Sequence, residues 1–325
     1  MLTWPDPAGD FADFARINQA FISLAKALAQ AAPVYISLAA ALDIANLRQA
    51  IGITPHPVHC QHAPVGDVWV RDHGPIGVYD KGRVRLLKFE FDGWGGKYPS
   101  QNDNALLPWL VDNADFAHIH DLETQGWVLE GGGVETDGQG TLLATTRSVL
   151  DPKRNPELSV AMIEDKLRAS LGIKRFHWLE HGGLAGDDTD GHIDTLVRFV
   201  APGVLVYQGA PESEGPNSAE LQAMAEELAQ WQQANGQAYE LHALPHTQQA
   251  HTRAPTGLPS SYSNFLFIND FLLVPQYSDP ADSAALELLR NLCPQHRVEG
   301  VDCSALVEQY GGLHCATMNI PLAHE

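Results

Sequence analysis

Five segments of the chain combine reactive side chains with glycines. Glycine allows sharp turns and close backbone approach, and loops of this kind commonly carry functional sites. The fourth segment supplies His192 and Asp194, which would point to one face on a strand, and the fifth ends in Cys315. A thiol and an imidazole can act as a nucleophile and as a general acid and base. The five segments are 69–75 (WVRDHGP), 91–96 (FDGWGG), 129–133 (LEGGG), 186–194 (GDDTDGHID) and 311–315 (GGLHC).

Each of these residues also has a purely structural interpretation. A lone cysteine is usually a small buried residue, and a histidine on an apolar strand usually belongs to the core. Asp72 next to Arg71 suits an ordinary ion pair. Glu130 suits a turn before its three glycines, and Trp94 suits the core. For the remaining cysteines we expect only the structural role: Cys60, Cys293 and Cys303.

A second constellation competes with the thiol and the imidazole. Residues 56–62 contain side chains of the types that bind zinc, which makes a metal-dependent hydrolase a rival. Their spacing matches no particular zinc motif, and the nearby prolines favour a strand and a loop. We therefore expect no metal and no cofactor. The cluster consists of His56, His59, Cys60 and His62.

The composition indicates a globular protein with little affinity for polyanions. A chain of 325 residues that is 44% hydrophobic is long enough to bury a sizeable core. The formal net charge of −20 disfavours nucleic acid and anionic membrane surfaces as partners. The acidic opening and the absence of an apolar run of about 18 residues predict a soluble, cytoplasmic protein with reduced cysteines.

Helical and strand patterns alternate along the whole chain without a linker, which predicts one α/β domain over residues 1–325. Apolar spacing predicts helices at 14–31, 156–171, 218–233 and 283–292. Runs of β-branched and aromatic residues predict strands at 84–91, 141–146, 195–200 and 204–208, and a hairpin over 265–275 that turns at Asn269-Asp270.

The alternation is close to periodic. A polar loop that feeds a strand recurs at Asp72, Glu130, His192, Ser263 and Cys315, at intervals of 58, 62, 71 and 52 residues. Units of this length cannot bury their own apolar faces, so they are expected to pack side by side as a ring or solenoid. An ordinary α/β sandwich remains open on this pattern alone.

Many separate runs of the sequence resemble one family. Between Trp69 and Pro321 the chain is similar, in the same order, to the agmatine deiminases and the related bacterial peptidyl-arginine deiminases. The resemblance implies the pentein fold, a five-bladed α/β propeller of ββαβ-like repeats with pseudo-fivefold symmetry. The runs are WVRDHGP, FDGWGGKYP, LEGGGVETDGQGTLLATT, DPKRNP, GDDTDGHID, SYSNF, VPQYSDP and GGLHCATMNIP.

The resemblance also implies a role for each site residue. Cys315 matches the nucleophile, and His192 matches the general acid and base. Asp72 and Asp194 match the two carboxylates that bind the guanidinium, and Glu130 matches the glutamate beside the histidine. The residues implied to bind the rest of the substrate are Trp69 and Trp94, as aromatic walls, and Asp188, as the partner of the far amine.

The implied reaction is hydrolysis of a guanidinium through a covalent adduct on cysteine. Two carboxylates can hold the planar cation by paired charge-assisted hydrogen bonds. The acidic run at 187–190 favours agmatine as the substrate. Free or peptidyl arginine remains an alternative substrate, because His73 stands where a small hydroxyl residue is expected. A polyamine-binding protein is a more distant alternative. A homodimer is expected by analogy with the family.

Overall fold

The computed structural model describes residues 1–113, 122–211, 217–248 and 257–321. The chain divides into two compact units. The first unit contains Met1–Gly131 and His314–Glu325, and the second contains Gly132–Leu313. Each unit is treated below by itself.

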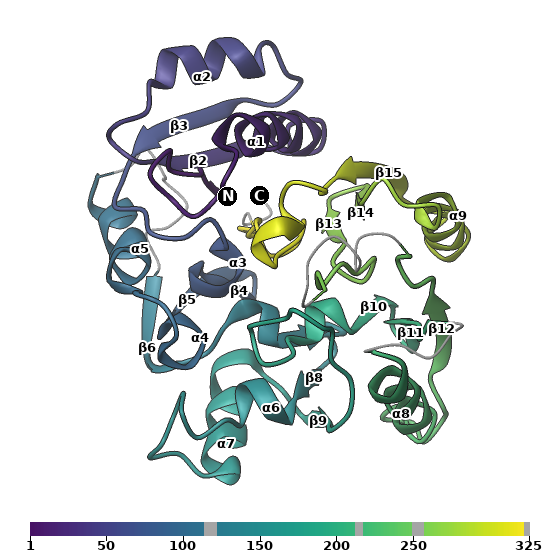
Figure 1. The fold of residues 1–325 in the computed structure, drawn as a ribbon. Helices are drawn as coiled ribbons and strands as arrows, with labels where there is room; N and C mark the ends of the chain where they lie inside the picture. The colour runs from purple at the N-terminus through teal and green to yellow at the C-terminus, as the bar shows by residue number, and fades with distance from the viewer. Residues whose placement is uncertain (114–121, 212–216, 249–256, 322–325) are drawn as a thin grey trace. The chain divides into compact units, whose positions relative to one another are not determined.

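Strands in the described residues form five three-stranded sheets, each ordered as in the sequence (Figure 1). Two sheets belong to the first unit and three to the second. The first unit holds β1 (Leu2–Thr3), β2 (Val34–Leu38), β3 (Val58–His62), β4 (Ile76–Asp80), β5 (Arg83–Glu90) and β6 (Leu122–Val128). The second unit holds β7 (Val134–Thr136), β8 (Thr141–Thr145), β9 (Arg175–Leu179), β10 (Val197–Ala201), β11 (Val204–Gln208), β12 (Glu240–Leu244), β13 (Leu266–Ile268), β14 (Phe271–Gln276) and β15 (Arg297–Asp302).

Four of these sheets repeat one pattern. The first two strands form an antiparallel hairpin, and the third strand then pairs in parallel with the second. A parallel return needs a crossover, which in these four sheets contains a helix. The remaining sheet differs, because β1 reaches β2 through a helix and pairs in parallel with it. The predicted repeat is therefore present, with a variant first module.

Three of the longer helices begin or end at recognisable capping residues. Asp13 and Asp43 accept hydrogen bonds from the first turns of α1 (Phe14–Leu28) and α2 (Ile44–Ile51). Gly172 ends α7 (Val160–Leu171) with φ of +71°, a left-handed conformation that favours glycine. The other described helices longer than one turn are α5 (Gln101–Asn113), α8 (Ser218–Leu228) and α9 (Asp282–Leu292).

The sequence predicted most of these elements, with errors at their ends. The strand 204–208 and the hairpin at Asn269-Asp270 are confirmed. The helix predicted from Pro156 begins instead at Val160, because the Ser159 side chain caps it. The helix predicted to reach residue 233 ends at Leu228.

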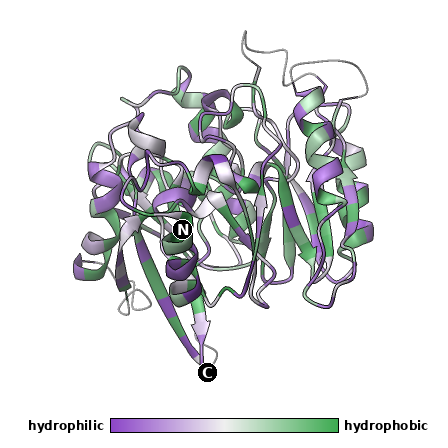
Figure 2. Cartoon of the chain, turned by 90° about the horizontal axis from the view of Figure 1, so that it is seen from below, coloured by the Kyte–Doolittle hydropathy of each residue, from purple (hydrophilic) through white to green (hydrophobic). Residues whose placement is uncertain are grey.

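Each unit has its own buried hydrophobic cluster. In the first unit Val70, Leu86 and Leu107 belong to such a cluster, and in the second unit Leu196 and Met224 belong to another. Helices carry hydrophobic and hydrophilic residues side by side (Figure 2), as expected when one helix face packs on a sheet. No helix in the described part of the chain has the length and apolar composition that crossing a bilayer requires.

Candidate active site

Asp72 is held by a tryptophan in the first unit. Asp72 lies on the short helix α3 (Val70–His73), which begins directly after Trp69. The side chains of Asp72 and Trp69 are both buried. The Nε1 atom of Trp94 donates a hydrogen bond of 3.0 Å to Oδ2 of Asp72. Two of the predicted site residues therefore contact each other, although they are 22 positions apart in the sequence.

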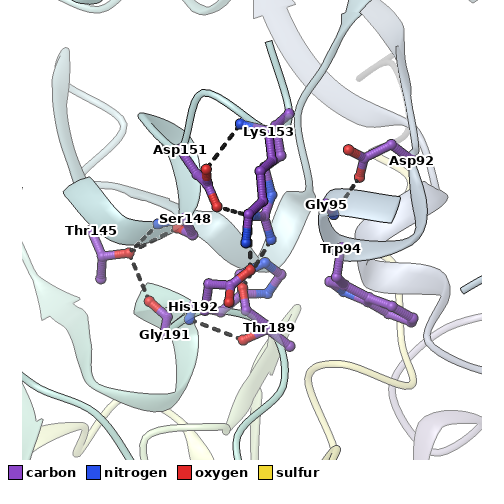
Figure 3. Close-up of polar contacts among 12 residues, drawn as sticks. Asp92, Trp94, Gly95, Thr145, Ser148, Asp151, Lys153, Thr189, Gly191 and His192 are labelled. Carbon is purple, nitrogen blue, oxygen red and sulfur yellow. Dashed lines mark hydrogen bonds and ion pairs between the residues drawn. The ribbon is translucent and has the colours of Figure 1, made fainter. Parts of the chain in front are cut away.

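Trp94 has an unusual backbone conformation. It lies in the one-turn helix α4 (Gly93–Gly96) with φ of 56° and ψ of 56°, in the left-handed region. Bulky residues rarely adopt this conformation, and it costs about 1–3 kcal/mol unless the surroundings enforce it. Asp92 enforces it by accepting a hydrogen bond of 2.8 Å from the Gly95 amide (Figure 3). Strain that is maintained in this way is typical of binding and catalytic sites.

Cys315 lies in a segment that Arg71 holds. The Arg71 amide donates to the Cys315 carbonyl at 3.0 Å, and Nε donates to the His314 carbonyl at 3.3 Å. The two terminal nitrogens of the guanidinium donate to Sδ of Met318 at 3.4 Å and to Oδ1 of Asn319 at 3.0 Å. Arg71 directly precedes Asp72, and it thus contacts the chain on both sides of Cys315.

The residue after Glu130 packs against the backbone of the same arginine. Glu130 is buried, and it precedes Gly131 of η1 (Gly131–Gly133). A Cβ atom at Gly131 would lie 2.3 Å from the Arg71 carbonyl oxygen, so only glycine fits at this position. The backbone contact places the Glu130 segment beside α3, in the unit that contains Cys315.

An acidic network lies next to α3, in which Asp103 is buried and Asp67 is half-buried. Asp103 Oδ1 accepts a hydrogen bond of 2.7 Å from the Asp67 amide and lies 3.6 Å from Nε2 of His73. Asp67 Oδ1 in turn accepts from the Trp69 amide at 3.2 Å. Burial, and then the charges of Asp103 and Asp72, raise the pKa of the Asp67 carboxyl to about 7. His73 stands where the family pattern predicts a small hydroxyl residue. Its side chain lies against Asp103 of the acidic network beside α3.

The second unit contains His192 and Asp194, but they do not lie on a strand as predicted. His192 is the residue before the one-turn helix η2 (Ile193–Thr195), and Asp194 lies inside that turn. The turn forms because the amide and the hydroxyl of Thr195 both donate to the His192 carbonyl, at 3.3 and 3.0 Å. Both predicted residues are buried, and β10 starts at Val197 after them.

The acidic run before His192 has mixed roles. Asp187 accepts hydrogen bonds from the amides of Thr189 and Gly191, so its carboxylate stabilises the loop itself. Asp190 binds Arg154 at 3.0 Å. Asp188, the residue predicted to bind the far amine, lies in the same loop. An open cavity of about 540 Å³ lies beside the loop in this unit, and Arg147, Asp151, Asp187 and Asp190 are among its lining residues.

The other cysteines have the surroundings of structural thiols. All three are buried. Burial raises the pKa of Cys293 to about 11 and also raises the pKa values of Cys60 and Cys303. Thiols of this kind are poor nucleophiles at neutral pH.

The rival zinc cluster is not assembled. Among the described residues, no three His, Cys, Asp or Glu side chains are grouped so that they could hold a metal ion. His59 stacks on Tyr35 with ring centroids 4.8 Å apart, whereas Nε2 of His62 lies 2.8 Å from the Leu42 carbonyl oxygen. Cys60 follows His59 on β3 and so points to the opposite face of the sheet.

The predicted residues thus fall into two groups. The first unit contains Trp69, Asp72, Trp94, Glu130 and Cys315, and the second contains Asp188, His192 and Asp194. Sequence reasoning missed the residues that support them, above all Arg71 as the anchor of the Cys315 segment and Arg154 as the partner of Asp190. The run DPKRNP, which contains Arg154, was the available signal, but it lies outside the glycine-rich segments.

The fold and the paired groups of residues define the class of protein. The chain has the pentein fold, an α/β fold of repeated modules. DDAH from Pseudomonas aeruginosa, which is 12% identical with a TM-score of 0.51, covers 97% of this chain and 96% of its own and shares the fold alone.

The family follows from closer matches. Residues 1–321 match the Porphyromonas-type peptidyl-arginine deiminase family, and the chain belongs to it. The agmatine deiminase of Pseudomonas fluorescens (strain SBW25) is 32% identical over 100% of this chain and 93% of its own. The agmatine deiminase of Stutzerimonas stutzeri (strain A1501) is 33% identical, and the match covers 98% of this chain and 92% of that protein. The structure of C. jejuni agmatine deiminase with substrate bound is 30% identical, with a TM-score of 0.88, and covers 97% of this chain and 90% of that one.

Proposed function

We propose that this chain hydrolyses agmatine to N-carbamoylputrescine and ammonia, as a hydrolase that acts on C–N bonds of linear amidines. The observation that carries this proposal is the match to agmatine deiminases over more than nine tenths of both chains. The substrate is a small cation, which suits the formal net charge of −20.

The proposed reaction has two covalent steps. The Cys315 thiolate attacks the central carbon of the guanidinium, and His192 protonates one amino group, which leaves as ammonia. The adduct that remains is an amidino-thioether on Sγ. His192 then removes a proton from water, the resulting hydroxide attacks the same carbon, and the C–S bond breaks to give the ureido product and the free thiol.

In this proposal, carboxylates bind the substrate cation. Asp72 and Asp194 accept paired N–H bonds from the guanidinium, which fixes the plane of the cation before attack. The hydrogen bond from Trp94 to Asp72 supports this role, because it fixes one carboxylate oxygen. Glu130 assists His192, Trp69 and Trp94 line the substrate pocket, and Asp188 binds the far ammonium.

A second candidate is deimination of free or peptidyl arginine to citrulline. The name of the matching family favours it. The two substrates differ at the end away from the guanidinium, because arginine presents an α-carboxylate where agmatine has only an ammonium. A pocket for arginine therefore needs a cationic side chain at that end, and a pocket for agmatine needs an acidic or aromatic one.

We further propose that residues 1–325 act as one catalytic domain in the cytoplasm, and that the chain forms a homodimer. The first part rests on the division of the site residues, since the thiol and the imidazole belong to different units. A single cooperative unfolding transition followed by two probes would support one domain.

The test is an assay of ammonia and ureido product on agmatine, arginine and a blocked arginine peptide in parallel. We expect turnover of agmatine to exceed that of the other two. A preference for the blocked peptide would favour the second candidate.

Dialysis against a chelator is a separate experiment. We expect activity to survive it, since the thiol itself supplies the nucleophile. Loss of activity that zinc restores would make a metal hydrolase the better hypothesis.

A further inference from the structure

Arg154 is a buried cation in the second unit. Its side chain is 2% exposed, although arginine is rarely this buried without partners. Its Nη1 atom donates to Oδ2 of Asp190 at 3.0 Å, and Nη2 donates to the Thr189 carbonyl oxygen at 3.0 Å. Nη1 also lies 3.6 Å from Oδ2 of Asp151. A fork of this kind fixes both the position and the orientation of the groups that it binds.

The residues that Arg154 binds lead directly to His192. Asp190 has φ of +67° and Gly191 has φ of +82°, so two consecutive residues are left-handed. Such a conformation costs about 1–2 kcal/mol for a residue with a side chain, although aspartate tolerates it better than most. Contacts outside the loop are needed to hold a backbone of this shape in one conformation.

Other backbone groups of this segment are also fixed. The Gly191 carbonyl accepts a hydrogen bond of 2.8 Å from Thr145 Oγ1 (Figure 3). The Gly191 amide donates a hydrogen bond of 2.7 Å to Asp187 Oδ2. The His192 amide donates 3.1 Å to Thr189 Oγ1. Arg154 therefore binds Thr189, whose hydroxyl accepts a hydrogen bond from the His192 amide.

We propose that Arg154 is a positioning residue that orients the His192 imidazole by holding Thr189 and Asp190. The proposal rests on the role assigned above to His192. The hydrogen bonds that Arg154 donates to Thr189 and Asp190 act on the loop that leads to His192.

The prediction is a loss in kcat that is larger than any change in KM, although Asp188 lies in the same loop. Binding depends on the carboxylates, whereas proton transfer depends on the imidazole geometry, and a misplacement of about 1 Å can cost up to about hundredfold in rate. Arg154→Lys keeps the charge but cannot bind Thr189 and Asp190 together, so we expect kcat to fall by about 10- to 100-fold. Asp190→Asn keeps the shape and tolerates φ of +67°, so we expect a smaller fall, of about tenfold.

A matched control is available on α7. Arg168 binds Glu164 and Asp165 at 2.8 and 2.9 Å and is exposed at 44%, so Arg168→Gln removes an arginine with two carboxylate partners far along the chain from His192. We expect this variant to keep the kcat of the wild type. An equal loss of kcat in Arg168→Gln would overturn the assignment, because disruption of any arginine–carboxylate pair in this unit would then have the same effect.

A measurement without substrate separates this proposal from the proposed function. In protein labelled with ¹⁵N-histidine, the His192 imidazole signal is assigned by its loss in His192→Ala. We expect Arg154→Lys and Asp190→Asn to shift or broaden that signal, and Arg168→Gln to leave it in place. A wild type that is inactive on every guanidinium compound would refute the proposed function, yet this measurement would still decide the positioning role.

A purely structural role gives a different result. If the two variants lower the melting temperature but leave both kcat per folded molecule and the His192 signal unchanged, Arg154 only stabilises the fold and the proposal is wrong. Should Arg154→Lys fail to fold, Asp190→Asn decides the question alone, because its side chain is partly exposed and its shape is conserved.

Discussion

The segments that carry Cys315 and His192 are each held by a buried arginine, but the partners of the two arginines differ. In the first unit, Arg71 binds a carbonyl oxygen, a thioether sulfur and an amide oxygen, acceptors that carry no net charge. In the second unit, Arg154 binds the Asp190 carboxylate. These contacts of Arg71 lie on both sides of Cys315 in the sequence, whereas those of Arg154 hold the loop that precedes His192.

The two sets of contacts suit the roles proposed for the two segments. The positive charge of Arg71 beside the Cys315 segment favours the thiolate. A histidine that protonates the departing amino group must itself carry a positive charge, and the Asp190 carboxylate that binds Arg154 lowers the repulsion from that arginine. The same type of side chain therefore anchors both segments.

The largest expected effect comes from removing the reacting group of each segment. Cys315→Ser should abolish turnover while agmatine still binds, because a hydroxyl is a far weaker nucleophile and the carboxylates remain. His192→Ala should bind agmatine and accumulate the covalent adduct if the bound cation alone ionises the thiol. Mass spectrometry after brief incubation with agmatine would detect the adduct. Full turnover by Cys315→Ser would refute nucleophilic catalysis by this residue.

The next effect compares the two guanidinium carboxylates. Asp72→Asn and Asp194→Asn each break one charge-assisted pair, at a cost on the order of 3–5 kcal/mol when the pair is buried. We expect both variants to lose agmatine affinity, measured by calorimetry in a Cys315→Ser background so that no turnover intervenes. If affinity is lost in only one variant, then the other aspartate is not a guanidinium clamp.

A smaller effect tests the arginine that holds the nucleophile. Arg71→Gln removes a positive charge beside the Cys315 segment, so less of the thiol is ionised at neutral pH. We expect the rate of Cys315 alkylation by iodoacetamide to fall on the order of 3- to 10-fold. Arg71→Lys keeps the charge and should retain most of the rate. Equal rates in the wild type and Arg71→Gln would show that Arg71 only anchors the segment.

Much of this architecture could be predicted from the sequence, and the exceptions are of two kinds. The strand 204–208 was predicted correctly, since a run of β-branched and aromatic residues is a local signal. The strand predicted from Thr195 begins instead at Val197, because a turn closed by Thr195 precedes it and contains Asp194. Secondly, nothing local reveals that Arg154 binds Asp190, 36 residues further on. Properties set by long-range partners escape a reading of sequence alone.

The left-handed backbone of Trp94 is an intermediate case. The glycines on both sides signalled a tight turn, and the family pattern singled out the tryptophan. The sequence could not predict that the indole would donate to Asp72, because that bond depends on how α3 and α4 pack.

The smallest expected effect concerns the acidic network that supports α3. Because the pKa of Asp67 is raised from 3.8 to about 7, the folded protein keeps a proton on this carboxyl that the unfolded chain has already released. The stability gained from that proton is complete below pH 3.8 and is lost as the pH rises to about 7. Asp67→Asn has no such proton, so its stability relative to the wild type should increase over this window and stay constant above it. One pKa unit corresponds to about 1.4 kcal/mol, so the change should be at most about 4 kcal/mol, and less to the extent that Asp67 is solvated. Urea unfolding of both proteins at pH 4 and pH 8 measures this change in stability.

Asp67→Ser removes the same charge with a different shape, so it should show the same pH dependence at a lower overall stability. A stability difference that is equal at the two pH values would show that Asp67 is ionised in the folded protein at pH 4, and that the carboxylates around α3 do not share a buried, proton-retaining site.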